Sequence, residues 1–237
     1  MKKVLKIFGI TISIIIAILV ILLIIFVAKQ FKQESLLNKE MVTIFDMDWN
    51  TEEVDMTIKT NGEIGRLEKI MKNYYQEFYK YRREYDEVDI YDFCKNSLEA
   101  QNLKDADLVK TKEQLIEYYN KSEKALEKII EMIDNDYRMK LVENKKFDEY
   151  DIELYIEYMF LTDEKETMEE WVTQGNYEYY IYELTIEALN VLINNPNDWK
   201  IQDNRIYFSN DSVLKQFNDI INLLNNYEKE DNSGGEA

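Results

Sequence analysis

The chain has 237 residues and a formal net charge of −18 at pH 7, from 29 basic and 47 acidic side chains. It contains no histidine and a single cysteine. These counts exclude histidine-ligated zinc, Ser-His-Asp and Cys-His catalysis, and an intrachain disulfide framework. An excess of negative charge repels phosphate backbones, so we also expect no binding to nucleic acid.

The apolar stretch 7–28, IFGITISIIIAILVILLIIFVA, is the most informative part of the chain. As a helix, its 22 uncharged residues would extend about 33 Å, enough to cross a hydrocarbon core of about 30 Å. A cleaved signal has a shorter apolar region and a small-x-small cleavage site. Here a cut after Ala28 would place bulky Phe26 at the third position before the cut, where a small residue is needed. A lipoprotein signal needs a cysteine after the apolar run, but the only one is Cys94. A globular core helix would keep a polar face. We therefore predict an uncleaved transmembrane anchor.

The lysines on the two sides of this stretch are nearly balanced, so the positive-inside rule decides the orientation only weakly. They are Lys2, Lys3 and Lys6 before it, and Lys29, Lys32 and Lys39 after it. The amino group and the very short first flank favour a cytoplasmic N-terminus, with the bulk of the chain outside the membrane.

Charge is distributed unevenly along the chain. Residues 1–39 carry six lysines and one glutamate, a net of +5, so residues 40–237 must carry −23 to give the total of −18. Such a region attracts cations and basic proteins and is repelled by anionic lipid headgroups. High solubility is the simpler role of this charge.

Few glycines, one proline and several apolar stripes of helical period predict an all-α fold with one transmembrane helix. We expect five segments: a cytoplasmic flank 1–6, the anchor 7–28, a helix extension and linker 29–60, a helical domain 61–228 and a disordered tail 229–237. Within segment 29–60, the helix should continue to about Lys39, and residues 41–60 should be irregular, either as a linker or as a strand-like arm that packs on the domain.

Capping patterns predict where several helices of the domain begin. Thr60-x-x-Glu63 precedes a stripe from Leu67 to Tyr85, and Thr111-x-x-Gln114 precedes a long stripe that ends at Leu141. Shorter helices are expected at 89–103 and 147–161. Asp163-x-x-Glu166 could begin another segment that ends at Gly175.

The C-terminal part predicts two further helices and the only credible β-structure. A helical stripe from Tyr177 to Leu192 should stop before Pro196. Residues 199–208 alternate as a small β-hairpin, with a weak turn signal because no glycine is present. The last helix should follow a cap at Ser209, Asn210 or Asp211.

One aromatic and basic cluster is a candidate partner or ligand surface. Most aromatic side chains between residues 74 and 85 fall on the stripe expected to be buried, and core packing is their simpler role. Four fall outside it and could stack on a ligand or a partner: Tyr75, Tyr79, Arg82 and Arg83.

The sequence offers no convincing catalytic or metal-binding residue, and we expect no cofactor. Asp46-x-Asp48-x-Asn50 matches the first three ligands of an EF-hand, but Thr51 and Thr57 replace its glycine and its bidentate glutamate. Cys94 lacks a histidine base and fits a small buried residue. Glu183 and Glu187 lie four positions apart beside an apolar stripe, and we interpret them as solvent-exposed residues at its edge.

We therefore expect a membrane-anchored, extracytoplasmic, helical protein that works by binding another protein, and its acidic surface favours a basic partner. An envelope-complex subunit, an adaptor and an inhibitor or immunity protein all fit. The alternatives are a carboxylate-dependent cell-envelope hydrolase and a cytoplasm-facing membrane scaffold. The sequence sets no oligomeric state.

Overall fold

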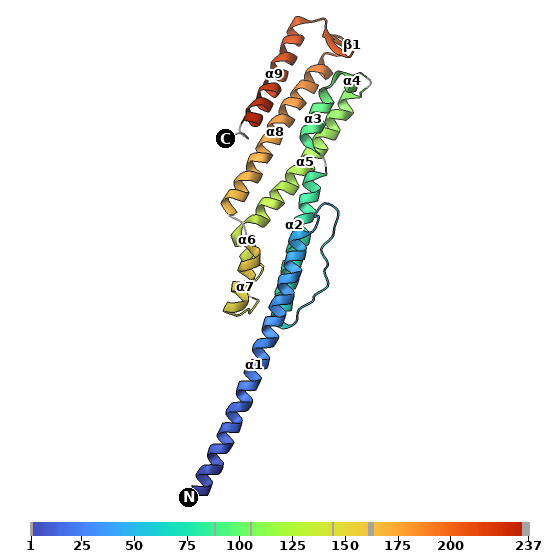
Figure 1. Cartoon of the computed structure of the whole chain (residues 1–237). Coiled ribbons are helices and arrows are strands. Elements are labelled where there is room, and N and C mark those ends of the chain that lie inside the picture. The colour runs from blue at the N-terminus through green and yellow to red at the C-terminus, as the bar shows by residue number, and fades with distance from the viewer. Residues whose placement is uncertain (1, 88, 105, 144, 161–163, 234–237) are drawn as a thin grey trace. The chain divides into compact units, whose positions relative to one another are not determined.

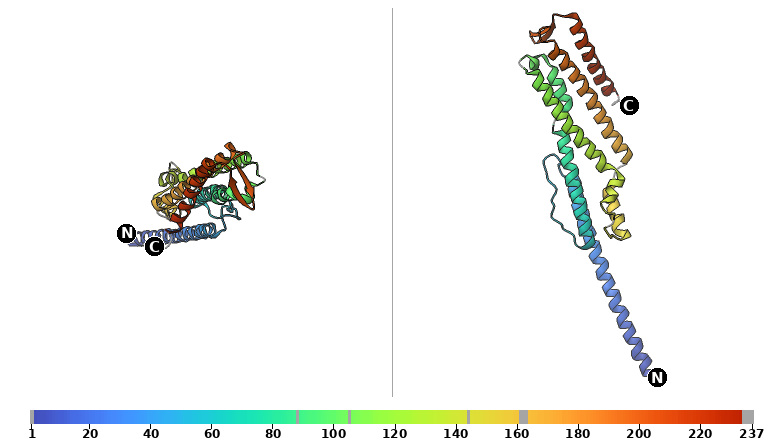
Figure 2. Two further views of the ribbon diagram at one scale, coloured as in Figure 1. Left: turned by 90° about the horizontal axis from the view of Figure 1, so that it is seen from above. Right: turned by 180° about the vertical axis from the view of Figure 1, so that it is seen from behind.

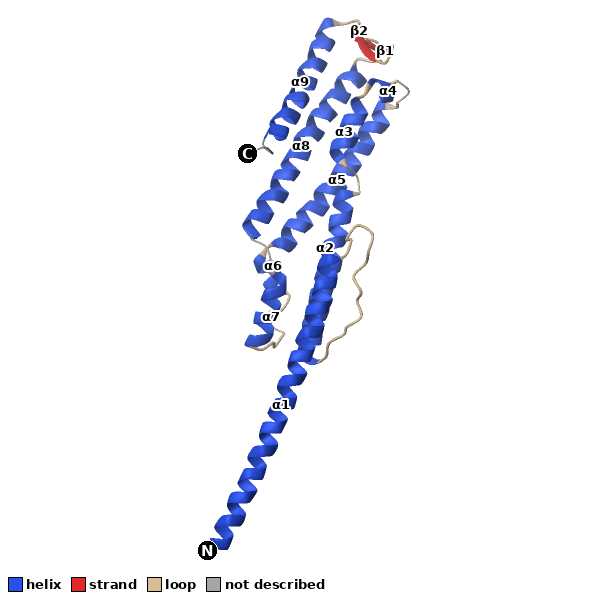
Figure 3. Ribbon diagram, viewed as in Figure 1, coloured by secondary structure: helices blue, strands red, loops and turns tan. Residues whose placement is uncertain are grey.

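The computed structural model describes residues 2–87, 89–104, 106–143, 145–160 and 164–233. They form helices and one antiparallel hairpin, so the predicted all-α fold with a hairpin at 199–208 is confirmed (Figures 1 and 3). The elements are α1 (Lys2–Asp46), α2 (Gly62–Asp86), α3 (Ile90–Leu98), α4 (Ala100–Leu103), α5 (Leu108–Ile133), α6 (Asn135–Lys140), α7 (Glu149–Met159), α8 (Glu164–Asn194), β1 (Trp199–Gln202), β2 (Arg205–Phe208) and α9 (Asp211–Ser233).

The chain divides into two compact units. The first consists of Met1–Glu77 and Arg138–Leu161, and the second of Phe78–Tyr137 and Thr162–Ala237. The boundaries fall inside α2 and α6, so each of these helices contributes to both units.

In the first unit, α1 is one continuous helix whose N-terminal part extends away from the other elements of that unit (Figure 1). From Ile15 onward it is long and apolar enough to cross a membrane, and none of its apolar window is buried. Large apolar side chains between Ile15 and Val27 are 42–63% exposed. Within the described residues, this is the helix whose length and composition meet the requirement for a membrane span.

After the apolar stretch, α1 continues to Asp46, so the prediction that residues 41–60 are irregular is wrong for its first six positions. The reason is a buried stripe: Leu37, Met41 and Ile44 lie on one helix face and are at most 3% exposed. This face packs on α2, where the ring of Phe45 meets that of Tyr75 at 5.3 Å. The irregular segment is the loop 47–61, which runs beside these two helices (Figure 2).

A buried ion-pair cluster joins α1, this loop and α2. Glu68 and Lys72 are both fully buried. The ammonium of Lys72 lies 2.8 Å from Glu68 Oε1 and 2.7 Å from Glu40 Oε2, and it donates to the carbonyl of Thr57 at 2.7 Å. An ammonium has three N–H donors, so all three have an acceptor here.

The same cluster explains why Thr60 does not cap α2 as predicted. Its hydroxyl donates to Glu68 Oε2 at 2.6 Å, and the backbone N–H groups of Lys59 and Thr60 also donate to that carboxylate. Burial alone would raise the pKa of Glu68, but the hydrogen bonds from Lys72, Thr60 and the backbone outweigh it and lower the pKa. The charges are compensated, and the cluster fixes α1 to α2.

Helix α7 completes the first unit and has narrower bounds than the predicted 147–161. The side chain of Asp148 caps it by accepting a hydrogen bond from the backbone N–H of Asp151. Tyr158 donates to Asn38 of α1 at 3.2 Å, and its carbonyl accepts from Tyr75 of α2 at 3.0 Å. These bonds hold α7 against both helices.

In the second unit, α8 packs against α3, α5 and α9. The core between them is apolar and aromatic, and the rings of Tyr119 and Tyr182 stack at 4.1 Å. Its buried members are Ile90, Cys94, Leu103, Leu115, Tyr119, Ile181, Leu184, Ala188, Leu189, Leu192, Phe217 and Ile220.

Three helix boundaries in this part of the chain differ from the predictions, because Asp107, Asp134 and Glu99 begin or end the helices there. Asp107 caps α5 by accepting from Lys110 N, so the helix begins before Thr111. Asp134 has a non-helical ψ of 129° and its carboxylate accepts from Tyr137 N, so the run to Leu141 is broken into α5 and α6. An extended Glu99 likewise divides the predicted helix 89–103 into α3 and α4.

Gly175 does not end a helix, contrary to the prediction, but lies inside the long helix α8. A Cβ atom at this position would lie 2.3 Å from Leu126 Cδ2 of α5. The glycine therefore allows α5 and α8 to approach closely. The predicted cap at Asp163 lies outside the described residues, whereas α8 ends at Asn194, before Pro196, as predicted.

The hairpin turn uses Asp203 and Asn204, with φ angles of 51° and 58°. Two positive φ values are typical of a type I′ turn, which aspartate and asparagine tolerate better than most residues. Trp199 anchors the hairpin by donating to the carbonyl of Leu192 at 2.9 Å. The following helix α9 begins at Asp211 and continues to Ser233, into the tail 229–237 that we expected to be disordered; residues 234–237 lie outside the described residues.

Candidate functional site

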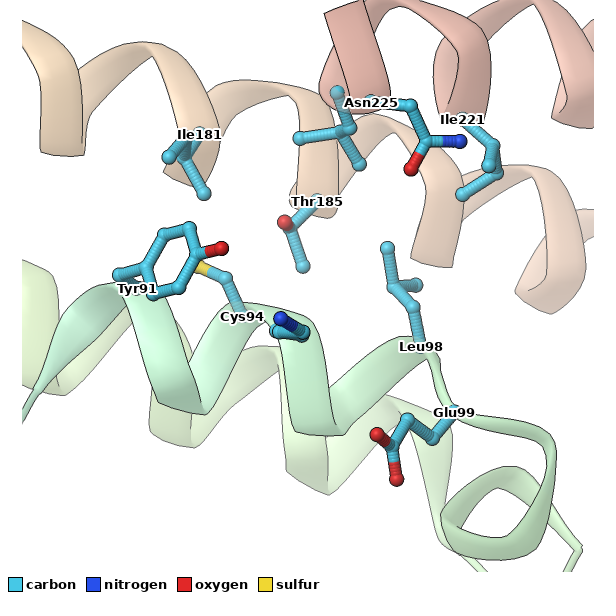
Figure 4. Close-up of a pocket in the computed structure, with 10 residues that line it drawn as sticks. Tyr91, Cys94, Leu98, Glu99, Ile181, Thr185, Ile221 and Asn225 are labelled. Atoms are coloured by element: carbon cyan, nitrogen blue, oxygen red, sulfur yellow. The ribbon is translucent and has the colours of Figure 1, made fainter. Parts of the chain in front are cut away.

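The second unit contains a pocket of about 210 Å³ between α3, α8 and α9 (Figure 4). Helical spacing places its lining residues: Cys94 and Leu98 are four apart on α3, and Ile181 and Thr185 are four apart on α8. The full lining is Tyr91, Cys94, Lys95, Leu98, Glu99, Ile181, Thr185, Ile221, Leu224 and Asn225. The walls are thus mostly apolar, with a few polar groups among them.

Cys94 lies at the base of this pocket and is 1% exposed. Burial raises the pKa of its thiol to about 12, and a polar contact with the Thr185 hydroxyl acts in the opposite direction. A thiol of this pKa stays protonated at neutral pH and is a poor nucleophile. The prediction that Cys94 is a small buried residue is confirmed.

Thr185 is the unusual polar group of the pocket. Its side chain is fully buried, and its hydroxyl oxygen makes no hydrogen bond of standard geometry with any described residue. Figure 4 shows it projecting between α3 and α9, into the space that the pocket occupies. An unsatisfied buried hydroxyl costs free energy, which a polar atom of a bound group or a water could recover.

The mouth of the pocket is polar. Lys95 lies over the ring of Tyr91, with its ammonium 5.4 Å from the ring centroid, and that ring stacks on Tyr177 at 6.2 Å. Asn225 is exposed and faces the opening from α9, whereas the carboxylate of Glu99 points away from the centre (Figure 4). The site can therefore receive an apolar group, while Thr185 and Asn225 can hydrogen-bond polar atoms next to that group.

Two carboxylates near the start of α3, those of Glu178 and Asp86, have the raised pKa values that the hydrolase alternative would need. Burial raises the pKa of Glu178, although Tyr85 donates to its carboxylate at 2.6 Å and Gln174 at 2.9 Å. Burial also raises the pKa of Asp86. Neither side chain lines the pocket. The carboxylate among the lining residues is that of Glu99. The two acids thus do not face that cavity.

The four residues predicted to form a partner surface are all on α2 but are not brought together as one site. Tyr75 belongs to the first unit, where its hydroxyl and ring contact α7 and α1. Tyr79, Arg82 and Arg83 belong to the second unit and are half-buried. The Arg82 guanidinium lies 5.6 Å from the ring of Trp171. None of the four lines the pocket, so a partner surface there stays a prediction.

The EF-hand-like segment forms an ordinary turn at the end of α1. Asp48 accepts from Asn50 N at 3.1 Å and from the Thr51 hydroxyl at 2.7 Å, as in an Asx turn. No group of three or more His, Cys, Asp or Glu side chains arranged to hold a metal occurs among the described residues.

Sequence reasoning missed both Thr185 and the buried Glu68–Lys72 pair. Thr185 falls within the predicted stripe of the helix, and its spacing from Ile181 was a usable signal of a buried position. In comparisons with protein-family models, curated proteins and solved structures, nothing matches this chain. The fold and site therefore define its class: an all-α protein with a helix able to span a membrane and a small, mostly apolar pocket.

Proposed function

We propose that this chain is a single-pass membrane protein with a cytoplasmic N-terminus, whose residues 61–228 act outside as a non-catalytic module that binds a basic protein. The observation that carries the proposal is the charge distribution. A net of +5 flanks the apolar helix within residues 1–39, and −23 lies in the rest of the chain. A helix long and apolar enough to span a membrane supports the tether.

In this proposal the anchor raises the effective concentration of the module at the membrane, and the acidic surface speeds the approach of a basic partner. The pocket gives the partner a point of attachment. An apolar side chain would enter between Leu98, Ile221 and Leu224, and a neighbouring polar atom would satisfy Thr185. Charge then contributes mainly to association rate, and the buried side chain contributes to residence time.

Cross-linking from membranes, followed by affinity capture of the full-length chain, tests the proposal. Asn225→Trp places a bulky side chain over the pocket, whereas Asn226→Trp makes the same change one position away, at an exposed residue outside it. We expect recovery of one basic protein with the wild type and with Asn226→Trp, and loss of that protein with Asn225→Trp or in high salt.

Capture that is empty with the wild type, or equal with both tryptophan variants, would contradict the proposed binding mode. Proteolysis of intact cells separates the two orientations, because an external module is degraded while a cytoplasmic scaffold survives. The hydrolase alternative has weaker support, since the carboxylates with raised pKa lie outside the pocket.

A further inference from the structure

The end of the first unit from which α1 leaves carries a distinct set of side chains. The backbone N–H of Asn61 donates to Gln33 of α1 at 2.6 Å, which fixes the start of α2 beside that helix. Tyr150, at the start of α7, is tied to Gln30 and Glu34 of α1, and burial together with the Glu34 bond raises its pKa to about 12. In Figures 1 and 2, the lower ends of the 47–61 loop and of α7 both lie where α1 leaves the unit.

We call this end the collar and define it by its exposed residues: Phe31, Lys32, Asn61, Gly62, Glu63, Lys145, Lys146 and Tyr150. Its distance from the apolar stretch follows from helix geometry. Gln33 is five residues after Ala28, and Gln30 and Glu34 are two and six residues after it, so they lie about 3–9 Å beyond the stretch. The headgroup layer beyond a hydrocarbon core is about 5–7.5 Å thick on each side. The collar would therefore be at headgroup depth.

The collar also has the composition of a membrane interface. Phe31 is 66% exposed and Tyr150 is 38% exposed, and aromatic rings are favoured at headgroup level. Charges in and next to the collar are balanced, unlike those of the chain as a whole. The basic ones are Lys29, Lys32, Arg66, Lys145 and Lys146, and the acidic ones are Glu34, Glu63, Asp148, Glu149 and Asp151. This end is thus not repelled by anionic lipid as the acidic remainder would be.

Arg66 holds the lysine-bearing loop at this end of the unit. Its guanidinium donates to the carbonyl of Lys145 and lies 4.7 Å from the ring centroid of Phe147. Lys145 and Lys146 are both exposed. Their ammonium groups are therefore available to lipid phosphates.

We infer that the collar is a lipid-contact surface, in which Phe31 and Tyr150 lie among the headgroups and Lys32, Lys145 and Lys146 bind their phosphates. The inference rests on the membrane tether of the proposed function. It adds that the first unit is seated on the bilayer rather than suspended from a flexible linker.

Site-directed fluorescence in vesicles of phosphatidylcholine and phosphatidylglycerol tests this inference. Tyr150→Cys and Glu63→Cys place an environment-sensitive label in the collar. Val42→Cys is the control, because Val42 is 46% exposed on α1 but lies about 21 Å beyond Ala28 along that helix. Leu19→Cys places the label inside the apolar stretch. Native Cys94 is buried with a thiol pKa of about 12, so it does not compete for the label.

A nitroxide on the lipid headgroup should quench the labels at 150 and 63 at least about twofold more than the label at 42, as expected from their depths. Equal quenching at all three positions would overturn the inference. A nitroxide in the middle of the acyl chain should quench the label at 19. If it does so while the collar labels match Val42, the tether holds and the collar contact fails; if it does not, both fail.

Discussion

The two units of this chain differ in what their interiors contain. The first combines a buried apolar stripe on α1 with charges that are buried and compensated, where Lys72 is bound to Glu40, Glu68 and the Thr57 carbonyl. The second is fixed by an apolar and aromatic core around α8, with a pocket at its edge. A hydrogen-bonded charge cluster specifies one geometry, which suits the segment that continues from the apolar stretch of α1. An apolar core tolerates a pocket at its edge, which suits the proposed binding role.

Removing the central charge of the first unit should produce the largest effect. Lys72→Met leaves the Glu68 carboxylate fully buried without a counter-charge, so we expect a loss of about 3–5 kcal/mol in the free energy of unfolding. Denaturation of the full-length protein in detergent, monitored by hydrogen exchange in α2, measures this loss of stability. Lys69→Met is the control, because Lys69 is exposed on the same helix and should change stability by less than about 0.5 kcal/mol.

The double variant Glu68→Gln with Lys72→Met sharpens this test. It removes both charges while the glutamine oxygen can still accept from the backbone of the loop, so part of the lost stability should return. Equal losses in the single and double variants would show that side-chain volume, rather than charge compensation, holds the first unit.

Filling the contact between α5 and α8 should have a moderate effect on the second unit. Gly175→Ala brings a Cβ atom to 2.3 Å from Leu126 Cδ2, the end of a half-buried side chain that can shift, so we expect the lower end of the usual overpacking cost, about 1 kcal/mol, partly offset by the better helix propensity of alanine. Thermal unfolding followed by circular dichroism measures it. In a Leu126→Ala background the same change should be neutral or stabilising, and persistence of the full loss there would contradict a steric cause.

Lowering the pH should change the stability of the two units differently, and this is the smallest of the expected effects. The pKa of Glu68 is lowered in the fold, so its contribution is present above the ordinary value of 4.5 and is lost as the pH falls below it. The pKa of Glu178 is raised by burial, so its contribution is present below 4.5 and is lost as the pH rises through the folded-state pKa.

Hydrogen exchange corrected for intrinsic rates should therefore show α2 losing protection below about pH 4.5, while the part of α8 around Glu178 does not. Glu68→Gln should remove the pH dependence in α2. Glu178→Gln should raise stability slightly near neutral pH and make no difference in acid. Parallel loss of protection in both helices would contradict the assignment to these two groups.

Helical stripes made most of the fold predictable, because apolar positions at spacings of three and four identify buried faces directly. Helix ends were less predictable, since Asp107 and Thr111 are both competent caps and only tertiary packing decides between them. Gly175 shows the same limit: a glycine in a helix predicts a C-terminal cap locally, but here it serves a contact with Leu126, 49 positions earlier.

The candidate sites were harder to predict for physical reasons. Glu68 and Lys72 have the spacing of an exposed ion pair on a helix, and their burial depends on Glu40 and on a loop that no local pattern places beside them. The pocket needs residues from α3, α8 and α9 together. Aromatic and basic residues on α2 were visible in the sequence, but the ring and hydroxyl of Tyr75 contact α1 and α7 of the first unit.

Extraction of membranes from cells that make the full-length chain is the most direct test of the membrane anchor. We expect the protein to stay in the membrane pellet through an alkaline wash, to keep its full length, and to be released only by detergent. Full-length protein in the soluble fraction, or a form trimmed near Ala28 and released, would contradict the tether and the function proposed from it.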